Sequence, residues 1–194
     1  STYPIVPSAA TGTGLGNYAI TYASGALTVS PRALTVVNTD RSKVYGDVLA
    51  GTDFAGSITG IQNGDNITLT RNSTGAVATA AVGGTYPIVA TLADPDNKLG
   101  NYALSNPNGT LTVTQKGLTI TALPRTKTYG DAVTFAGTEF TSAGLANGDA
   151  VSGVTLTSTG AASTATVAGS TYPIVPSAAT GTGLGNYAIT YASG

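Results

Sequence analysis

The feature that most constrains this chain is a repeat of whole domains. Residues 170–194 are identical to residues 1–25, so the sequence returns to its start after 169 residues. The shorter motifs TYPIV, LGNYA and NGD return at about half that distance, every 83 to 86 residues. A unit of this length is too long for a solenoid rung, which spans ~20–45 residues, and is the size of a small domain. The repeat therefore predicts two unlike modules of one type.

These spacings divide the chain into three parts. Residues 1–31 correspond to the C-terminal part of a preceding module, residues 32–115 to a complete module, and residues 116–194 to a second module that lacks its last strand. We name these parts the N-terminal segment, the first module and the second module. Because Ser1 already lies inside a repeated motif, we expect the chain to be a segment of a longer repetitive protein.

Short stretches that alternate apolar residues with Thr predict half-buried strands, because successive strand side chains point to opposite faces. Residues 34–36, 111–114 and 118–121 follow this pattern. We expect about six to eight short strands per module, arranged as an antiparallel β-sandwich of immunoglobulin-like size. Modules of a β-grasp-like fold are the alternative. The predicted fold class is all-β.

The apolar residues of the second half of each module are expected to form its core. The residues expected there are Tyr86, Tyr102 and Leu104 in the first module and Tyr172, Tyr187 and Ile189 in the second. In the N-terminal segment we expect three strands, at residues 2–6, 17–22 and 26–30. Without the front of their module, these strands have no core of their own and need a packing partner.

The pentapeptide Lys-x-Tyr-Gly-Asp occurs twice, 84 residues apart, and its residues are Lys43, Tyr45, Gly46, Asp47, Lys127, Tyr129, Gly130 and Asp131. We interpret it as a structural turn rather than a binding site. Gly provides a position with positive φ, and Asp bonds the local backbone. Tyr packs inward, and Lys is a solvated residue that pairs with Asp. An isopeptide crosslink from either Lys to an Asn is the alternative.

The motif Leu-Gly-Asn-Tyr is interpreted as a second structural mark. Its residues are Gly100 and Tyr102 in the first module and Gly185 and Tyr187 in the second. The spacing of Gly and Tyr is similar to the tyrosine corner of immunoglobulin sandwiches, in which the hydroxyl group bonds to nearby backbone. We therefore expect these hydroxyl groups to bond to the main chain.

The composition argues against several classes of function. The chain has no His and no Cys, which removes the usual general bases, thiol nucleophiles and zinc ligands, so we expect neither an enzyme nor a cofactor. The net charge of −1 without a basic run argues against nucleic-acid binding. No apolar run approaches the ~20 residues of a membrane span.

Asp94 and Asp96 are the one pair of residues that resembles part of a calcium loop. Two carboxylates fall short of the usual ~6–8 oxygen ligands. The second module has no carboxylate at the matching position, where Ser177 and Thr180 stand instead. We therefore interpret the pair as part of an Asp-Pro turn.

The stretches KTYGD, GGTYPIVATLADPDNKLGNYALSNPNGTLTVT and GLTITA resemble the MBG and YDG-type repeats of bacterial surface proteins. The resemblance covers residues 32–115 and, apart from the missing strand, residues 116–194. It implies a β-rich stalk or fibre module of an extracellular adhesin or exoprotein at the cell surface, without catalytic residues. The two modules differ at one stretch, which reads ADPDNKLGNY in the first module and PSAATGTGLGNY in the second.

The expected function is a structural stalk that assembles head to tail. Only four residues separate Val29 from Leu34, so the last strand of one module runs almost directly into the next module. Neighbouring copies are the expected partners, with residues 26–30 of one copy supplying the strand that the second module of another lacks. An adhesive module that binds a surface glycan through Tyr3, Tyr22 and Tyr45 is the alternative.

Overall fold

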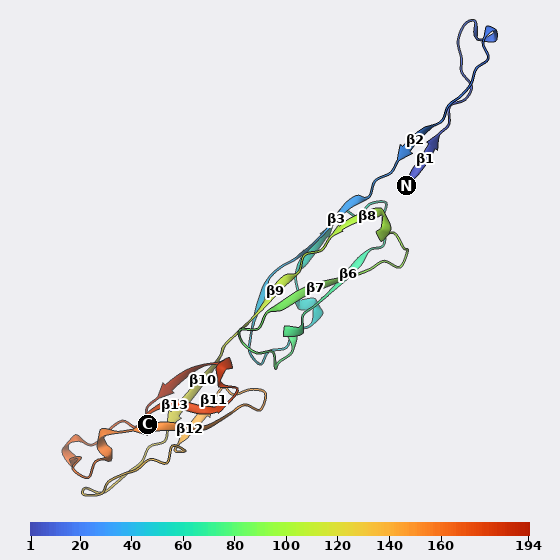
Figure 1. The fold of residues 1–194 in the computed structure, drawn as a ribbon. Coiled ribbons are helices and arrows are strands. Elements are labelled where there is room, and N and C mark those ends of the chain that lie inside the picture. The colour runs from blue at the N-terminus through green and yellow to red at the C-terminus, as the bar shows by residue number, and fades with distance from the viewer.

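The computed structural model describes residues 1–194, and it is built from short strands and single-turn helices. The N-terminal segment, the first module and the second module follow one another along a line, so the chain forms a rod (Figure 1). The N-terminal segment lies at one end of this rod and the second module at the other. The two identical stretches, residues 1–25 and 170–194, are therefore far apart in the molecule.

The first module contains seven strands in two sheets. A three-stranded sheet has the order β5-β3-β8, and a four-stranded sheet has the order β4-β9-β7-β6. The strands are β3 (Arg32–Asn38), β4 (Arg41–Val44), β5 (Gly56–Thr59), β6 (Thr68–Asn72), β7 (Tyr86–Ala93), β8 (Tyr102–Ser105) and β9 (Gly109–Thr114).

The second module repeats the first sheet but only half of the second sheet. Its strands are β10 (Lys116–Ala122), β11 (Phe140–Ala143), β12 (Ala150–Thr157), β13 (Val175–Thr182) and β14 (Tyr187–Ala192). The order β11-β10-β14 matches β5-β3-β8, whereas β12 and β13 form a separate two-stranded sheet. The second module contains no counterpart of β9. Since β9 bonds β4, the stretch that matches β4 also has no strand partner and is not a strand.

The N-terminal segment forms a single hairpin of β1 (Thr2–Ile5) and β2 (Gly25–Thr28). The expectation of a third strand at residues 17–22 is wrong. The identical sequence in the second module forms β14, which bonds β10 in parallel. The N-terminal segment has no counterpart of β10, so this stretch has no partner and stays irregular.

The all-antiparallel arrangement expected from the sequence is also wrong. Three strand pairs are parallel: β3 with β8, β4 with β9, and β10 with β14. In each module, the first strand is hydrogen-bonded in parallel to a strand near the C-terminal end of that module: β3 to β8, and β10 to β14. The modules are thus small mixed sheets, and an immunoglobulin-like sandwich is not what they show.

The structure contains no α-helix, so the helix that a β-grasp packs against its sheet is not present either. The helical elements are single 3₁₀ turns: Leu15–Asn17, Gly51–Asp53, Thr74–Ala76, Leu99–Asn101, Thr159–Ala161, Val167–Gly169 and Leu184–Asn186. None of them has the length and hydrophobicity needed to cross a membrane.

The alternation of apolar and Thr residues predicts the buried faces correctly. Leu34 and Val36 of β3, and Leu118 and Ile120 of β10, are buried, while the residues between them are not. Of the expected core residues, Tyr102 and Tyr187 are buried, whereas Tyr86, Tyr172 and Ile189 are half-buried. The expectation for Leu104 is wrong: β8 is an edge strand, and this side chain is 44% exposed.

Candidate functional site: the joint between the modules

The two modules are joined by a single residue, and one buried apolar cluster extends across the joint. Gln115 is the only residue between β9 and β10. Tyr45, Ala80 and Val113 of the first module belong to the same buried cluster as Leu118 and Ile120 of the second. Because a continuous apolar cluster crosses the joint, bending the joint would expose part of it to water.

The first Lys-x-Tyr-Gly-Asp motif forms a tight turn at this joint. Gly46 has φ of +92°, a conformation that favours glycine, and the N–H of Asp47 donates to the carbonyl of Val44 over 3.1 Å. A Cβ atom on Gly46 would lie 3.2 Å from the Cβ of Ala146 in the second module. Glycine is therefore required both by the turn and by the close approach of the two modules.

Lys43 is buried and stabilises this turn through hydrogen bonds to the main chain. The expectation of a solvated lysine is therefore wrong at this position. The ammonium group of Lys43 donates to the main-chain oxygen of Asp47 over 2.8 Å and to that of Val77. It therefore meets the main chain of Asp47 and no Asn side chain. Burial lowers the pKa of Lys43, and the nearby Asp47 carboxylate partly opposes this shift.

Tyr45 reaches from this turn into the second module. Its hydroxyl group donates to Oδ2 of Asp149 over 2.9 Å, and its ring meets the ring of Tyr187 edge to face, with centroids 5.5 Å apart. The side chain is only 4% exposed. Edge-to-face tyrosine pairs contribute about 0.5–1.5 kcal/mol beyond their buried area. The aromatic residue of the motif is therefore a contact between modules.

Tyr187, from the Leu-Gly-Asn-Tyr motif, contacts Tyr45 from the second module. We name the surface formed by Tyr187, Asp149 and Ala146 the receiving side of the joint. The hydroxyl group of Tyr187 donates to Oδ2 of Asp149 over 2.7 Å and accepts the N–H of Ala146 over 2.9 Å. Burial and the bond to Asp149 raise the pKa of Tyr187. The expected main-chain bond is present, but it reaches 41 residues back along the chain, and not a few residues as in a tyrosine corner.

Three further side chains form hydrogen bonds across the joint. Oδ1 of Asn186 accepts the N–H of Val82 over 2.9 Å. Nδ2 of Asn147 donates to the carbonyl of Ala78 over 2.9 Å, and Nε2 of Gln115 donates to the carbonyl of Tyr187 over 3.1 Å. The Asn residues of the NGD and LGNY motifs thus bond the first module, which gives both motifs a role at the joint.

The second copy of the turn, at residues 127–131, has the same backbone conformation as the first but contacts no other module. Lys127 donates to the carbonyls of Asp131, over 3.0 Å, and Ala162, as Lys43 does at the equivalent positions. Gly130 has φ of +98°. Tyr129, however, is 64% exposed, whereas Tyr45 is buried. The outer end of the second module therefore presents the same turn with its aromatic ring uncovered.

The opposite end of the first module presents the matching receiving side. The hydroxyl group of Tyr102 donates to Oδ2 of Asp65 over 2.7 Å and accepts the N–H of Gln62 over 3.0 Å. These contacts repeat those of Tyr187, Asp149 and Ala146. The bond to Asp65 raises the pKa of Tyr102. No second tyrosine reaches this carboxylate.

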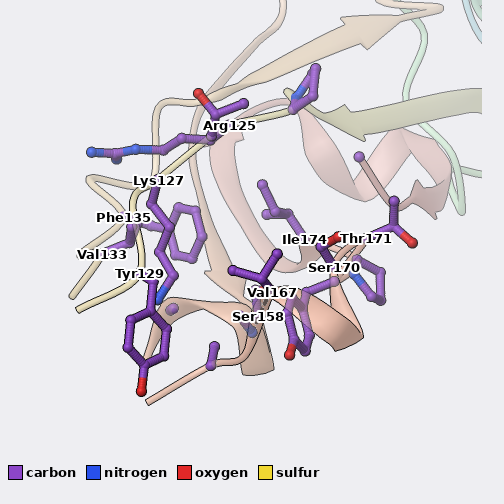
Figure 2. Close-up of a pocket in the computed structure, with 18 of the residues that line it drawn as sticks. Arg125, Lys127, Tyr129, Val133, Phe135, Ser158, Val167, Ser170, Thr171 and Ile174 are labelled. Atoms are coloured by element: carbon purple, nitrogen blue, oxygen red, sulfur yellow. Dashed lines mark hydrogen bonds between the residues drawn. The ribbon is translucent and has the colours of Figure 1, made fainter. Parts of the chain in front are cut away.

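A groove of about 690 Å³ opens in the second module. Figure 2 shows Lys127, Tyr129 and Phe135 on one side of it and Val167 and Ile174 on the other. In the first module β9 occupies the equivalent place, between β4 and β7. The groove therefore corresponds to the place that β9 fills in the first module.

The remaining candidate residues lie elsewhere. Asp94 accepts the N–H groups of Lys98 and Leu99, over 2.9 and 2.7 Å, so its carboxylate caps a loop as the turn interpretation requires. Asp96 is exposed, and Gly100 and Gly185 lie in single-turn helices with open space around them.

The three Tyr residues of the glycan alternative are not brought together. Tyr45 is buried in the joint, while Tyr3 and Tyr22 lie in the N-terminal segment. The hydroxyl group of Tyr22 accepts the N–H of Ala10.

Sequence reasoning missed Asp65 and Asp149, which organise the two receiving sides. Both stand in the recurring NGD motif, so a signal was present in the sequence. The repetition alone did not reveal which residue of another module each carboxylate would meet.

Residues 34–112 and 118–194 each match the family model of the MBG domain (YGX type). No curated protein and no solved structure matches the chain. The two matches cover most of the sequence, and the chain therefore belongs to the MBG domain (YGX type) family, as two tandem domains. The Tyr-Gly of that description fits residues 45–46 and 129–130, the turns described above. Repeats of MBG domains are typical of bacterial surface proteins.

Proposed function

We propose that the chain is a non-catalytic spacer from the extracellular part of a bacterial surface protein, where tandem modules form a stalk. The observation that carries this proposal is the joint. Domains in one chain move relative to one another by default unless their interface is well packed. Here a one-residue linker, a shared apolar cluster and the contact of Tyr45 with Asp149 restrict that motion.

The use of the recurring carboxylates supports a structural role. Asp65 and Asp149 each accept a tyrosine hydroxyl group, so they serve packing within or between modules. The groove of the second module corresponds to a place that β9 fills in the first module.

Small-angle X-ray scattering of the 194-residue chain at low concentration tests whether the joint is fixed. The wild-type chain should scatter as a single extended rod. The variant Gly46→Leu should broaden the distribution of angles between modules, because its side chain would meet Ala146 across the joint.

The matched control is Gly130→Leu. It introduces a side chain at nearly the same φ, and therefore similar backbone strain, but with no atom within 4 Å of the new Cβ. Its scattering should match the wild type. Equal scattering for all three chains, or a wild-type chain that already samples many angles, would contradict a rigid spacer.

A further inference from the structure

The receiving sides of the two modules differ at the residue that precedes the NGD motif. This residue is Ala146 in the second module and Gln62 in the first. The backbone around both is alike. The N–H of each donates to the hydroxyl group of a tyrosine, over 2.9 and 3.0 Å, and the Asn that follows has φ of +56° and +55°. The difference between the two positions therefore lies in the side chain.

The methyl group of Ala146 lies directly against the turn of the first module. A Cβ atom added to Gly46 would lie 3.2 Å from this methyl group, which is shorter than an ordinary van der Waals contact between such atoms. Ala146 is half-buried and packs against the apolar cluster that crosses the joint. The contact is therefore closed, and it leaves no room for a larger side chain in the same direction.

The distance between the turn and the receiving side is fixed by one main-chain oxygen that both modules bind. The carbonyl of Ala78 accepts the N–H of Gly46 over 3.2 Å, within the first module. It also accepts Nδ2 of Asn147, from the second module, over 2.9 Å. Asn147 follows Ala146 in the chain, so both bonds lie close to the methyl group. The turn cannot move away from residue 146 without straining one of them.

A glutamine is a poor fit for this contact. Its side chain adds a methylene and a whole amide group beyond the Cβ atom. In the first module the side chain of Gln62 is exposed, and its Nε2 donates to the carbonyl of Ile61 over 3.0 Å. Placing such a side chain in a closed contact displaces the groups around it. A glutamine at position 146 would therefore hold the turn farther from the receiving side.

The residue that precedes the first strand of each module differs in the same sense. Gln115 precedes β10, and its Nε2 donates to the carbonyls of Gly185 and Tyr187, over 3.4 and 3.1 Å. The residue that precedes β3 is Pro31. Proline has no side-chain amide to form these bonds. The module with the small residue before NGD therefore also has the linker residue that bonds its receiving side.

We propose that the residue before the NGD motif determines how closely two of these modules join, and that Ala146 selects a tight joint with the Tyr-Gly turn. A receiving side with glutamine at this position, as in the first module, fits such a turn at a greater distance and forms a looser joint. The proposal rests on the spacer function proposed above, and it names the residue that regulates the stiffness of the spacer.

The polar contact beside residue 146 depends on the same fit. Oδ2 of Asp149 accepts the hydroxyl group of Tyr45 over 2.9 Å, and the side chain of Tyr45 is only 4% exposed. If the turn is held farther away, this bond lengthens and water reaches the carboxylate. Water then competes for the acceptor, so the bond contributes less to stability. The contribution of Tyr45 should therefore depend on a small side chain at position 146.

The variant Ala146→Gln gives the second module the residue of the first. Residue 146 lies between β11 and β12, outside the sheets. In small-angle X-ray scattering at low concentration, this variant should show a broader distribution of angles between the modules than the wild-type chain. The matched control is Gln62→Ala, which makes the reverse exchange at the opposite end of the first module. Its scattering should match the wild type.

A double-mutant cycle with Tyr45→Phe separates a loosened joint from a general loss of stability. In the wild-type chain and in Gln62→Ala, Tyr45→Phe should raise the unfolding equilibrium constant about fivefold, since one hydrogen bond contributes about 1 kcal/mol and 1.4 kcal/mol is tenfold. In Ala146→Gln the same substitution should change this constant less than about twofold, because the bond is already weakened. Urea denaturation measures both quantities.

A fivefold effect of Tyr45→Phe in both backgrounds, or wild-type scattering from Ala146→Gln, would overturn the proposal. A broader distribution in the control Gln62→Ala would do the same, because the effect would then not belong to the joint. These outcomes are distinct from failure of the spacer function, which would appear as a wide distribution of angles in the wild-type chain itself.

Discussion

At the scale of single residues, the coupling of the modules depends on one carboxylate that receives two tyrosines. Oδ2 of Asp149 accepts the hydroxyl groups of both Tyr45 and Tyr187. One tyrosine comes from each module, so the carboxylate is the point at which the two repeated motifs meet. Hydrogen bonds to a charged acceptor are stronger than neutral ones, and the bond from Tyr45 is the one of this pair that crosses the joint.

The substitution Tyr45→Phe removes one of these bonds while it preserves the ring contact with Tyr187. We expect the free energy of unfolding to fall by about 1 kcal/mol, the usual net value of one hydrogen bond. Urea denaturation measures this change. Tyr129→Phe serves as the control, because its exposed side chain meets no second module, and it should leave the midpoint unchanged. Equal effects of both substitutions would show that Tyr45 does not couple the modules.

Lys43→Met tests the buried lysine. Methionine keeps the length of the side chain but leaves the carbonyls of Asp47 and Val77 without their donor, which costs about 1–3 kcal/mol when the groups are buried. The equivalent substitution Lys127→Met lies at a more exposed site and should cost less. Thermal unfolding of both variants compares them, and a larger loss for Lys127→Met would contradict the role assigned to Lys43.

The raised pKa of Tyr187 predicts a dependence of stability on alkaline pH. A group whose pKa is raised by folding adds stability below its ordinary value, about 10 for tyrosine, and loses that contribution as the pH rises through the raised pKa. Below pH ~10 the wild type should therefore be more stable than Tyr187→Phe. The two curves of unfolding free energy against pH should converge at higher pH. Parallel curves would rule out titration of this hydroxyl group.

At the scale of elements, identical sequence does not give identical structure in this chain. Residues 6–13 and 175–182 have the same sequence, yet only the second stretch forms a strand, β13, which bonds β12. Residues 18–23 and 187–192 differ in the same way, because only the latter have β10 beside them. The partner strand, and not local propensity, decides whether these residues become a strand.

Amide hydrogen exchange measured by NMR provides an internally controlled test of this difference. The two stretches have equal intrinsic exchange rates because their sequences are equal. The amides of residues 175–182 that bond β12 should be protected, whereas those of residues 6–13 should exchange at nearly the unprotected rate. Similar protection of both stretches in the monomer would contradict the structure described here.

This contrast also explains how far the sequence could predict the fold. The repeat, the all-β class and the buried faces of β3 and β10 follow from local patterns, and they were predicted correctly. The parallel pairs and the irregular residues 17–22 depend on partners that lie far along the chain, which no local pattern encodes. The role of Asp149 was missed for the same reason: the NGD motif specifies a turn, while its partner Tyr45 belongs to the neighbouring module.

At the scale of the whole molecule, the rod is held by side-chain packing and hydrogen bonds at the joint. The alternative is a stalk that is stiffened by bound calcium, and Asp94 is the residue at which this alternative can be tested. The carboxylate of Asp94 is engaged by the N–H groups of Lys98 and Leu99. A carboxylate used in this way is a poor start for a site that needs ~6–8 oxygens.

We therefore expect the chelator EDTA to leave the thermal unfolding midpoint and the scattering curve unchanged. Differential scanning calorimetry with and without added calcium measures the first quantity. The variant Asp94→Asn, which removes the charge but keeps the side-chain size, separates a loop effect from a metal effect. A midpoint that falls on chelation in the wild type but not in this variant would establish a calcium site at Asp94.

The position of the first and last strands within their sheets has a mechanical consequence. A pull along the rod enters the first module through β3 and leaves it through β9, since these strands connect to the neighbouring parts of the chain. Both are interior strands, β3 between β5 and β8, and β9 between β4 and β7. Neither can peel away from an edge one hydrogen bond at a time. Under tension each must slide past two neighbours at once, so the force is shared by whole rows of bonds in shear.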